Sequence, residues 1–414
     1  MTNITTQGAA AKLAARSLAT AGTAQKNAAL AAIAAALRAK TDAILAANAE
    51  DMAAARENGM RESLLDRLEL TAARIGDIAA GVEEIIALPD PVGRVEDFTT
   101  RPNGLQIGRK KVPLGVIAFI YEARPNVTVD AAALCLKSGN AVILRGGKEA
   151  FNSNSAFVEL MREAVASAGL SADCVNLVQD TTRQSVNDLM NLTGVVDLLI
   201  PRGGAGLIDH VCANSKVPVV QTGVGNCHVY IEKTASLQMG AEIIFNAKCS
   251  RPSVCNAAET LLVDRDIAAE FLPMAKALLD AKNTELRGCA ETLKILPSAT
   301  LAVDEDWATE FGDYVLAVKI VDGLDEAMAH ITRYSTGHSE AIVTENYTAS
   351  QRFLDEIDAA AVYVNASTRF TDGGVFGLGA EIGISTQKMH ARGPMGLEQL
   401  TSSKFIIFGS GQVR

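Results

Sequence analysis

The stretch Lys248-Cys-Ser-Arg-Pro-Ser-Val-Cys255-Asn-Ala-Ala-Glu-Thr260 decides how this chain is interpreted. It puts a thiol between a short polar run and the apolar run Leu261–Val263, which predicts a strand. At such a junction a thiol can be partly exposed and close to backbone N–H groups. Those groups would lower its pKa and stabilise an oxyanion formed when it attacks a carbonyl. The alternative is a small buried hydrophobe, and this segment alone leaves both interpretations of Cys255 open.

Length, charge and cysteine usage narrow the class of protein. The chain has 414 residues, more than one ordinary core, so we expect two or more lobes. A formal net charge of -10 argues against nucleic acid or an anionic membrane as the main partner. No apolar run approaches the length of a membrane span. The seven cysteines form no CxxC pair or zinc spacing, which predicts a reducing, cytoplasmic setting with no disulfide framework and no metal site.

The N-terminal segment is rich in alanine and has no acidic residue before Asp42. Such a start is also typical of an organelle transit peptide. We favour an ordinary N-terminal helix pair, because the helical pattern continues past Asp42 without a break and apolar side chains share one face. Those side chains are Leu13, Leu18, Leu30, Ile33 and Leu37. Residues 9–57 are therefore predicted to be helical, with Gly59 just past the end.

Further along, Thr71 is placed to N-cap another helix that ends before Pro89. The run Phe98–Ile107 then carries Asn103-Gly104 between two extended stretches, which predicts a β-hairpin. A hairpin that projects from a complete domain often pairs with another subunit, so we expect a homo-oligomer.

From Val112 onward, apolar strands alternate with helices, which predicts an α/β protein with a mostly parallel sheet. The strands expected in this first series are Gly115–Ile120, Ala141–Leu144, Val175–Val178, Val196–Ile200 and Val217–Val220. The helices expected between them include Val127–Lys137, Asn154–Ala168 and Gly206–Ala213. A second series begins near Leu237, with strands at Thr260–Val263, Val315–Ile320, Glu340–Val343 and Ala361–Asn365. Ligands of such sheets bind at the carboxyl ends of the strands.

Two glycine-containing loops follow strands of the first series. Pro201-Arg202-Gly203-Gly204 leads into a helix, where backbone N–H groups could hold a pyrophosphate. A tight strand-to-helix turn explains the same residues equally well. Arg145-Gly146-Gly147-Lys148 lacks the G-K-[ST] pattern of a phosphate-cradling loop. Its two basic residues could bind a ribose phosphate, or they are only solvated surface.

Other polar residues have two interpretations each. Asn126, beside Pro125, could donate its amide to an oxyanion or could N-cap the following helix. His330 and His338 are spaced too widely for a metal pair on one helix face, so they either line a substrate pocket or end a helix. Ser367-Thr368-Arg369 could hold the polar groups of an amino acid, with Arg369 on a carboxylate, or could form an ordinary loop.

Taken together, these motifs resemble the aldehyde dehydrogenase superfamily over essentially the whole chain. Within it, they are similar to the enzymes that reduce an acyl phosphate to an aldehyde. The segments that carry the resemblance are the Cys255 stretch, Tyr121-Glu-Ala-Arg-Pro-Asn126-Val-Thr, Ile200-Pro-Arg-Gly-Gly, the run from Val321 through His330-Ile and His338-Ser-Glu, and His390-Ala-Arg-Gly-Pro-Met-Gly-Leu-Glu.

The resemblance implies a Rossmann-type cofactor domain, an α/β catalytic domain and a small β oligomerisation element. The NADPH-binding domain would comprise 1–97 and 115–230, the catalytic domain 231–385, and the oligomerisation element 98–114 and 386–414. It further implies reduction of L-glutamyl 5-phosphate by NADPH to L-glutamate 5-semialdehyde, the second step of proline biosynthesis. We also expect this protein to associate with the kinase that makes glutamyl phosphate.

On the same resemblance, Cys255 is the nucleophile, Asn126 the oxyanion donor and Glu310 the residue that holds the nicotinamide ribose. Charge and position alone make Arg124, Lys248 and Arg251 candidates for contacting the phosphate. Hydrolytic members of the superfamily carry a glutamate base where this chain reads Val220-Gln-Thr-Gly-Val-Gly225-Asn, with no acid. Absence of that base suits an enzyme that keeps its thioester from water. A CoA-acylating dehydrogenase and a non-enzymatic nucleotide-binding relative remain as alternatives.

Overall fold

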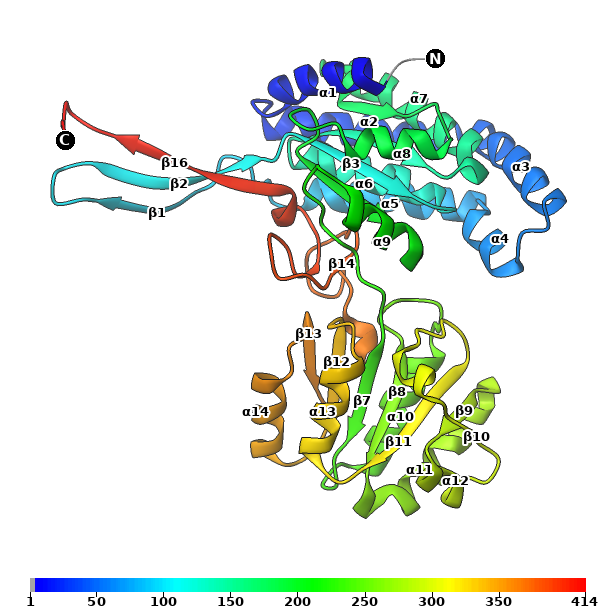
Figure 1. Cartoon of the computed structure of the whole chain (residues 1–414). Coiled ribbons are helices and arrows are strands. Elements are labelled where there is room, and N and C mark those ends of the chain that lie inside the picture. Colours follow the sequence, from blue (N-terminus) through cyan, green and yellow to red (C-terminus); the bar gives the residue numbers. More distant parts are fainter. Residues whose placement is uncertain (1–3) are drawn as a thin grey trace. The chain divides into compact units, whose positions relative to one another are not determined.

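The computed structural model describes residues 4–414, which form two compact units (Figure 1). Unit 1 comprises the chain up to Thr222 together with Gly377–Gly383 and Met395–Arg414. Unit 2 comprises Gly223–Phe376 and Ile384–Pro394. The first three residues of the predicted 1–97 segment lie outside the described residues. None of the helices within residues 4–414 is long and apolar enough to cross a membrane.

Unit 1 is built around a four-stranded parallel sheet in the order β5-β4-β3-β6. The strands are β3 (Val116–Tyr121), β4 (Ala141–Gly146), β5 (Val175–Leu177) and β6 (Leu198–Arg202). They confirm four predicted strands to within about two residues. The fifth, Val217–Val220, is wrong, because the segment makes only an isolated bridge between Leu199 and Val219. Pro218 lies in its centre and has no N–H to donate to a neighbouring strand.

The N-terminal segment forms three helices, of which the first packs against the sheet and the other two pack on α7 (Phe151–Ser167). Where we predicted a helix pair within residues 9–57, the structure has three helices, α1 (Ile4–Leu18), α2 (Thr23–Ala39) and α3 (Thr41–Glu57). The chain leaves the helical conformation at Gly22, which is extended, and at Lys40. The predicted apolar face holds except at Leu13, whose side chain is 69% exposed. α1 lies with this residue toward solvent, while small alanines such as Ala11 and Ala15 face the core.

Among the remaining helices of unit 1, α5, α6, α7 and α9 confirm predicted helices to within about three residues, whereas no bounds were predicted for α4 and α8. Thr71 N-caps α5 (Ala72–Ala87) by accepting the Arg74 N–H at 3.1 Å, as expected. Gly59 has a positive φ of 69° just past α3, as a helix-ending glycine requires. The other helices are α4 (Glu62–Leu68), α6 (Pro125–Lys137), α7 (Phe151–Ser167), α8 (Arg183–Met190) and α9 (Ala205–Asn214), with short 3-10 turns at η1 (Lys148–Ala150) and η2 (Ala172–Cys174).

A separate three-stranded antiparallel sheet belongs to unit 1. β1 (Val95–Thr100) and β2 (Gln106–Pro113) form the predicted hairpin, and Gly104 in its turn has a φ of 86°. β16 (Thr401–Phe408) pairs with β2 along its whole length. The three strands extend away from the helices of unit 1 (Figure 1) and leave several large apolar side chains exposed. Both outer strands, β1 and β16, have an unpaired edge within the described chain.

Unit 2 contains a seven-stranded parallel sheet in the order β10-β9-β11-β8-β7-β12-β13. Apolar side chains fill both faces of the sheet, as expected for parallel strands covered by helices. Its strands are β7 (Cys227–Ile231), β8 (Ala258–Asp264), β9 (Glu285–Gly288), β10 (Thr300–Leu301), β11 (Val315–Val321), β12 (Ser339–Val343) and β13 (Ala361–Val364). Its helices are α10 (Leu237–Cys249), α11 (Arg265–Leu279), α12 (Ala290–Ile295), α13 (Leu324–Tyr334) and α14 (Tyr347–Glu356).

All four strands predicted for this lobe are confirmed, and β7 is a central strand that we did not predict. Its sequence, Cys-His-Val-Tyr-Ile, begins with two polar residues and lacks the continuous apolar run that identified the others. Short elements complete the unit: β14 (Ile384–Ser385) pairs with β15 (Gly393–Pro394), and 3-10 turns lie at η3 (Asp280–Lys282), η4 (Asp304–Ala308) and η5 (Thr368–Phe370). The last such turn of the chain, η6 (Glu398–Leu400), precedes β16 in unit 1.

A buried ion pair joins the helical layer of unit 1. The Lys26 ammonium in α2 lies 2.6 Å from an Asp90 carboxylate oxygen and donates to the Lys137 carbonyl at the end of α6. Because both charged side chains are almost completely buried, the loss of either leaves the other without its counter-charge in a poorly solvated place.

We therefore predict that Lys26→Met lowers the free energy of unfolding by about 3–5 kcal/mol, the usual cost of breaking a buried ion pair. Lys40→Met is the matched control, since Lys40 pairs with Glu163 at the surface and the loss of such a pair costs less than about 1 kcal/mol. Denaturant unfolding measures both variants, and equal effects would contradict the role of the buried pair.

Candidate active site

Cys255 lies in the turn that joins α10 to β8, as the sequence predicted. Its side chain is partly buried, and none of the seven cysteines, all of which the structure describes, forms a disulfide. The turn closes with a hydrogen bond from the Ala257 N–H to the Val254 carbonyl at 3.0 Å. The thiol is therefore held on a short, hydrogen-bonded turn directly before a buried central strand.

The segment before β7 packs directly against this turn. A Cβ on Gly225 would lie 1.4 Å from the carbonyl oxygen of Cys255, so only glycine fits there. The Gly225 N–H donates to a Glu310 carboxylate oxygen at 3.1 Å. Next to it, the Asn226 amide donates to the carbonyls of Trp307 and Tyr334, both at 2.8 Å. Glu310 thus anchors the backbone that packs against the Cys255 turn.

The loop around η5 holds the other side of the turn. Asn256 donates to the Thr371 carbonyl at 2.9 Å, and the buried Thr368 hydroxyl donates to the Asn256 carbonyl at 2.7 Å. The Ser367 hydroxyl N-caps η5 by accepting the Arg369 N–H. The hydroxyls of Ser367 and Thr368 therefore make hydrogen bonds within the protein that order the Cys255 turn and the η5 loop.

Two guanidinium groups lie within electrostatic range of one another near the thiol. Arg369 donates to the side chains of Asn256 and Ser250, which flank the turn in sequence. Burial lowers the pKa of Arg369, the charge of the exposed Arg251 lowers it further, and negative charge on Cys255 raises it. A thiolate and an anionic substrate would both be stabilised by this concentration of positive charge.

Lys248 is not available to a phosphate, contrary to its candidacy from the sequence. Its ammonium is completely buried and lies 2.5 Å from a Glu259 carboxylate oxygen on β8. Burial lowers the pKa of Lys248 and raises that of Glu259 to about 7. The carboxylate also accepts the Gly312 N–H at 3.2 Å. The Lys248–Glu259 pair therefore links α10, β8 and the segment after Glu310 inside the protein.

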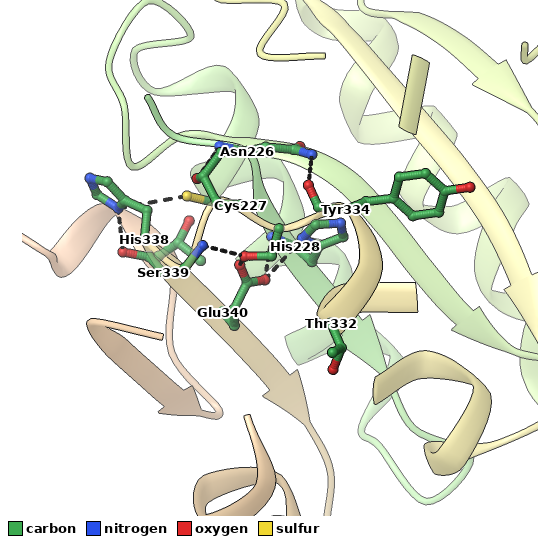
Figure 2. Close-up of polar contacts among 12 residues, drawn as sticks. Asn226, Cys227, His228, Thr332, Tyr334, His338, Ser339 and Glu340 are labelled. Atoms are coloured by element: carbon green, nitrogen blue, oxygen red, sulfur yellow. Dashed lines mark hydrogen bonds and ion pairs between the residues drawn. The ribbon is translucent and has the colours of Figure 1, made fainter. Parts of the chain in front are cut away.

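A second buried polar group lies where β7 and β12 run side by side (Figure 2). The Glu340 carboxylate accepts the backbone N–H of His228 at 2.9 Å and lies 3.0 Å from its ring Nδ1. On the neighbouring residues, His338 Nδ1 lies 2.8 Å from the Ser339 hydroxyl. Within residues 4–414, no group of three or more His, Cys, Asp or Glu side chains is arranged to hold a metal ion.

In unit 1, the carboxyl ends of β3, β4 and β6 bring together the glycine loops and the Asn126 segment. The Glu122 N–H donates to the Arg202 carbonyl, and the Glu122 carboxylate accepts the Gly204 N–H at 2.9 Å. Ala123 has a φ of 28°, an uncommon value for a non-glycine residue that marks local strain at the end of β3. Its N–H donates to Glu149 at 2.7 Å.

Asn126 is the second residue of α6, and Arg124 is the N-cap. The alternative interpretation of Asn126 as the N-cap is therefore wrong, because Pro125 already occupies the first helical position. The Asn126 amide donates to the Asp130 carboxylate at 3.0 Å, and desolvation raises the pKa of Asp130 to about 6. This bond orients the amide from one turn further along the helix.

The basic residues of the β4 loop differ in their surroundings. The Arg145 guanidinium donates to the carbonyls of Gly146, Thr181 and Thr182, so it orders the loop after β5. Lys148, at the start of η1, is exposed. A Cβ on Gly147 would lie 2.1 Å from the Glu149 carboxylate, so a larger residue there would require the Glu149 side chain to move.

Comparison with known proteins agrees with this arrangement. The aldehyde dehydrogenase family model matches residues 2–287. The chain belongs to the aldehyde dehydrogenase family. A gamma-glutamyl phosphate reductase of Halothermothrix orenii is 61% identical over 99% of this chain and 98% of its own length. One of Moorella thermoacetica is 59% identical, with the same coverage. The crystal structure of the Thermotoga maritima gamma-glutamyl phosphate reductase matches with a TM-score of 0.96 and 49% identity, covering 99% of both chains.

Aldehyde dehydrogenases use a nicotinamide cofactor, and the residues of unit 1 fit such a group. Gly203 and Gly204 are exposed where β6 leads into the ten-residue helix α9, whose N-terminus favours negative charge. Arg202 and the exposed Lys148 add positive charge at the same edge of the sheet. The carboxylate of Glu122, itself exposed, occupies the Gly204 N–H and would have to leave if a phosphate bound there.

Sequence reasoning missed the contacts that Gly225 and Cys227 make with the carbonyl of Cys255. The signal was present in Gly225-Asn-Cys227-His, a glycine and a cysteine at the start of an unrecognised strand. The family resemblance related residues 220–226 to the site as the place of the missing base. Without β7 in the predicted sheet, no pattern in the residues placed Gly225 and Cys227 against Cys255.

The buried His338 gives the stability of the fold a pH dependence. Burial lowers its pKa from 6.5 to about 4. As the pH falls below 6.5, the unfolded chain binds a proton that the folded protein does not bind until about pH 4. Stability is therefore lost progressively between these two values and is fully present above them.

We predict that His338→Asn, which keeps a polar atom near the Nδ1 position but cannot titrate, removes part of this loss. Between pH 7.5 and 4.5 its free energy of unfolding should fall by about 2–3 kcal/mol less than that of the native protein. Denaturant titrations at both pH values measure this difference. His210→Asn at an exposed site is the control, and identical slopes for all three proteins would contradict the assignment.

Proposed function

We propose that this protein uses NADPH to reduce L-glutamyl 5-phosphate to L-glutamate 5-semialdehyde with release of phosphate, through a thioester on Cys255. The observation that carries the proposal is the partly buried thiol of Cys255 on a fixed turn. Arg369 lies within electrostatic range of both Cys255 and Arg251. Relatives that are 61% and 59% identical over nearly the whole chain are gamma-glutamyl phosphate reductases, which supports the substrate. The reaction would be the second step of proline biosynthesis.

The first half of the reaction follows from the chemistry of the turn. The Cys255 thiolate attacks the acyl carbonyl, and the carbonyl oxygen becomes an oxyanion. The backbone N–H of Cys255 is one proposed donor to it, and Asn126 is the other on the family resemblance. Collapse of the adduct breaks the acyl–phosphate bond, and phosphate leaves with the electron pair. Arg251 and Arg369 are proposed to stabilise substrate anions, together with Arg124.

The second half requires a hydride, which bound NADPH supplies. We propose that Arg202, Gly203, Gly204 and Lys148 hold its phosphates, with Pro201 and Gly146-Gly147 shaping the two loops and Arg145 ordering the loop after β5. Glu310 is proposed to hold the nicotinamide ribose in addition to its bond with Gly225. The segment Val220–Asn226 has no acidic residue to activate water, which favours a thioester that survives until it is reduced. Ser367 and Thr368 are proposed to act on the substrate by ordering the loop that carries Arg369.

The test is run in reverse, with glutamate-5-semialdehyde and NADP+, with and without inorganic phosphate. The native protein should reduce NADP+ only when phosphate is present, because phosphate must release the acyl group from Cys255. Cys255→Ala should lose at least about 1000-fold in kcat, as expected when a covalent nucleophile is removed, while NADPH binding measured by fluorescence stays unchanged. Cys289→Ala, a partly buried thiol elsewhere in unit 2, is the control.

Three outcomes would contradict the proposal. Turnover without phosphate would indicate a hydrolytic dehydrogenase. Dependence on coenzyme A instead of phosphate would indicate a CoA-acylating enzyme. Near-native activity of Cys255→Ala would remove the proposed nucleophile.

We also propose that the β1-β2-β16 sheet joins copies of this chain into a homo-oligomer. The side chains of Phe405 and Ile407, two residues apart, lie on the same face of β16 and are 70% and 60% exposed. Long strands with exposed apolar side chains and unpaired edges normally pair with another chain. We further propose that this protein is cytoplasmic and that it associates there with the kinase that makes the labile acyl phosphate.

Phe405→Ser combined with Ile407→Ser should raise the dissociation constant of the oligomer on the order of 100-fold or more, because each buried apolar side chain contributes about 1.5–3 kcal/mol. Sedimentation velocity over a range of protein concentrations measures the change. Leu13→Ser removes an equally exposed apolar side chain from α1 and should leave the oligomer intact. A native protein that is monomeric at all concentrations would contradict this role of the sheet.

A further inference from the structure

The carbonyl group of Cys255 is held by two residues of the segment that forms the start of β7. Gly225 lies so close to it that no side chain fits between them. Two residues further on, the Cys227 thiol donates a hydrogen bond to the same oxygen, with a sulfur–oxygen distance of 3.3 Å. Fixing this carbonyl fixes the ψ torsion of Cys255, one of the two soft backbone torsions of that residue.

Cys227 is suited to donate and not to react. Its side chain is completely buried at the start of a central strand. Burial raises the pKa of the Cys227 thiol well above its ordinary value, and the charges of Glu340 and Cys255 raise it further. The group therefore keeps its proton, which is the proton that the Cys255 carbonyl accepts.

His338 and Ser339 lie next to Cys227 (Figure 2) and begin a series of polar side chains that continues to Thr371 and Tyr363. His338 Nδ1 lies 3.8 Å from its sulfur and 2.8 Å from the Ser339 hydroxyl. Ser339 in turn lies 2.6 Å from the Thr371 hydroxyl, which lies 2.7 Å from the Tyr363 hydroxyl. This series of polar side chains therefore links the start of β7 to β12, β13 and the residue that follows η5.

The same series of polar side chains also reaches Asn256, the residue that follows Cys255. The Thr371 carbonyl accepts a hydrogen bond from the Asn256 side chain at 2.9 Å. The oxygen of the Cys255–Asn256 peptide is thus held through Cys227, and the residue after it through Thr371. Both contacts lead back to strands at the centre of unit 2.

We propose that Cys227 is a positioning residue, whose thiol orients the Cys255 peptide and thereby the direction of the Cys255 side chain. The inference rests on the proposed function, because it takes Cys255 as the nucleophile. It gives Cys227 a role different from that of an apolar side chain that only fills space.

Two substitutions separate positioning from packing. Cys227→Ala removes both the donor and part of the volume. Cys227→Ser is small and polar but keeps a donor. If Cys227 only fills space, the serine variant should be no better than the alanine variant, since a buried hydroxyl is harder to accommodate than a methyl group. If Cys227 positions the nucleophile, the serine variant should recover function.

The readouts are kcat, the two KM values, and the rate at which iodoacetamide alkylates Cys255 without cofactor, followed by peptide mass spectrometry. Cys227→Ala should lower kcat and the alkylation rate about tenfold, below the roughly 100-fold cost of a 1 Å displacement, with both KM values within about twofold of native. Cys227→Ser should return both rates to within about threefold of native. Cys249→Ala is the matched control, because Cys249 is also buried in unit 2 but lies 3.4 Å from the Thr284 hydroxyl.

Native rates in Cys227→Ala would overturn the inference, and so would equal losses in the alanine and serine variants. Should the alanine variant fail to fold, Thr371→Val carries the test. It leaves Cys227 intact, breaks the series of polar side chains, and should slow alkylation about threefold to tenfold. A native alkylation rate in Thr371→Val would then count against the inference. Activity in Cys255→Ala would refute the proposed function itself, whereas an inactive Cys255→Ala beside fully active Cys227 variants would refute only the positioning role.

Discussion

The close approach of Gly225 to the carbonyl of Cys255 is the constraint on which the site in unit 2 depends. The two segments meet because β7 and β8 are neighbouring parallel strands, with Cys227 opposite Ala258. A side chain at residue 225 would overlap the carbonyl oxygen, so the contact requires glycine. Glu310 then fixes the glycine through its N–H. The position of the thiol is therefore set by backbone packing between two central strands.

The ionisable side chains around this contact fall into two groups. Some are buried and paired with each other, and others lie near the Cys255 thiol. Lys248 and Glu259 satisfy each other inside the protein, and His228 is paired with Glu340. Beside the turn, Arg369 lies within electrostatic range of Arg251, Cys255 and Asp372. Under the proposed function, the positive charge of the two guanidinium groups would stabilise both a thiolate and an anionic substrate at this turn.

Unit 1 also contains a parallel sheet, but the ends of its strands carry different groups from those in unit 2. Its strand ends carry exposed glycine backbone and basic side chains, and Arg145 is used to order a loop. The strained Ala123 conformation is held by hydrogen bonds that cross between strand ends, from Ala123 to Glu149 and from Glu122 to Arg202. Such strain persists only where the surroundings enforce it, and it lies three residues before Asn126.

The sequence by itself determined the α/β class, the hairpin at Asn103-Gly104, the strand after Cys255 and the family, because these follow from apolar periodicity, turn chemistry and local motifs. It could not reveal that Lys248 is buried against Glu259, or that Gly225 and Cys227 both contact the carbonyl of Cys255. It placed a strand at Val217–Val220 where Pro218 prevents one, and missed β7, whose polar start conceals a central strand. Those features depend on which strands become neighbours, and strand order is decided only when residues far apart in the chain pack together.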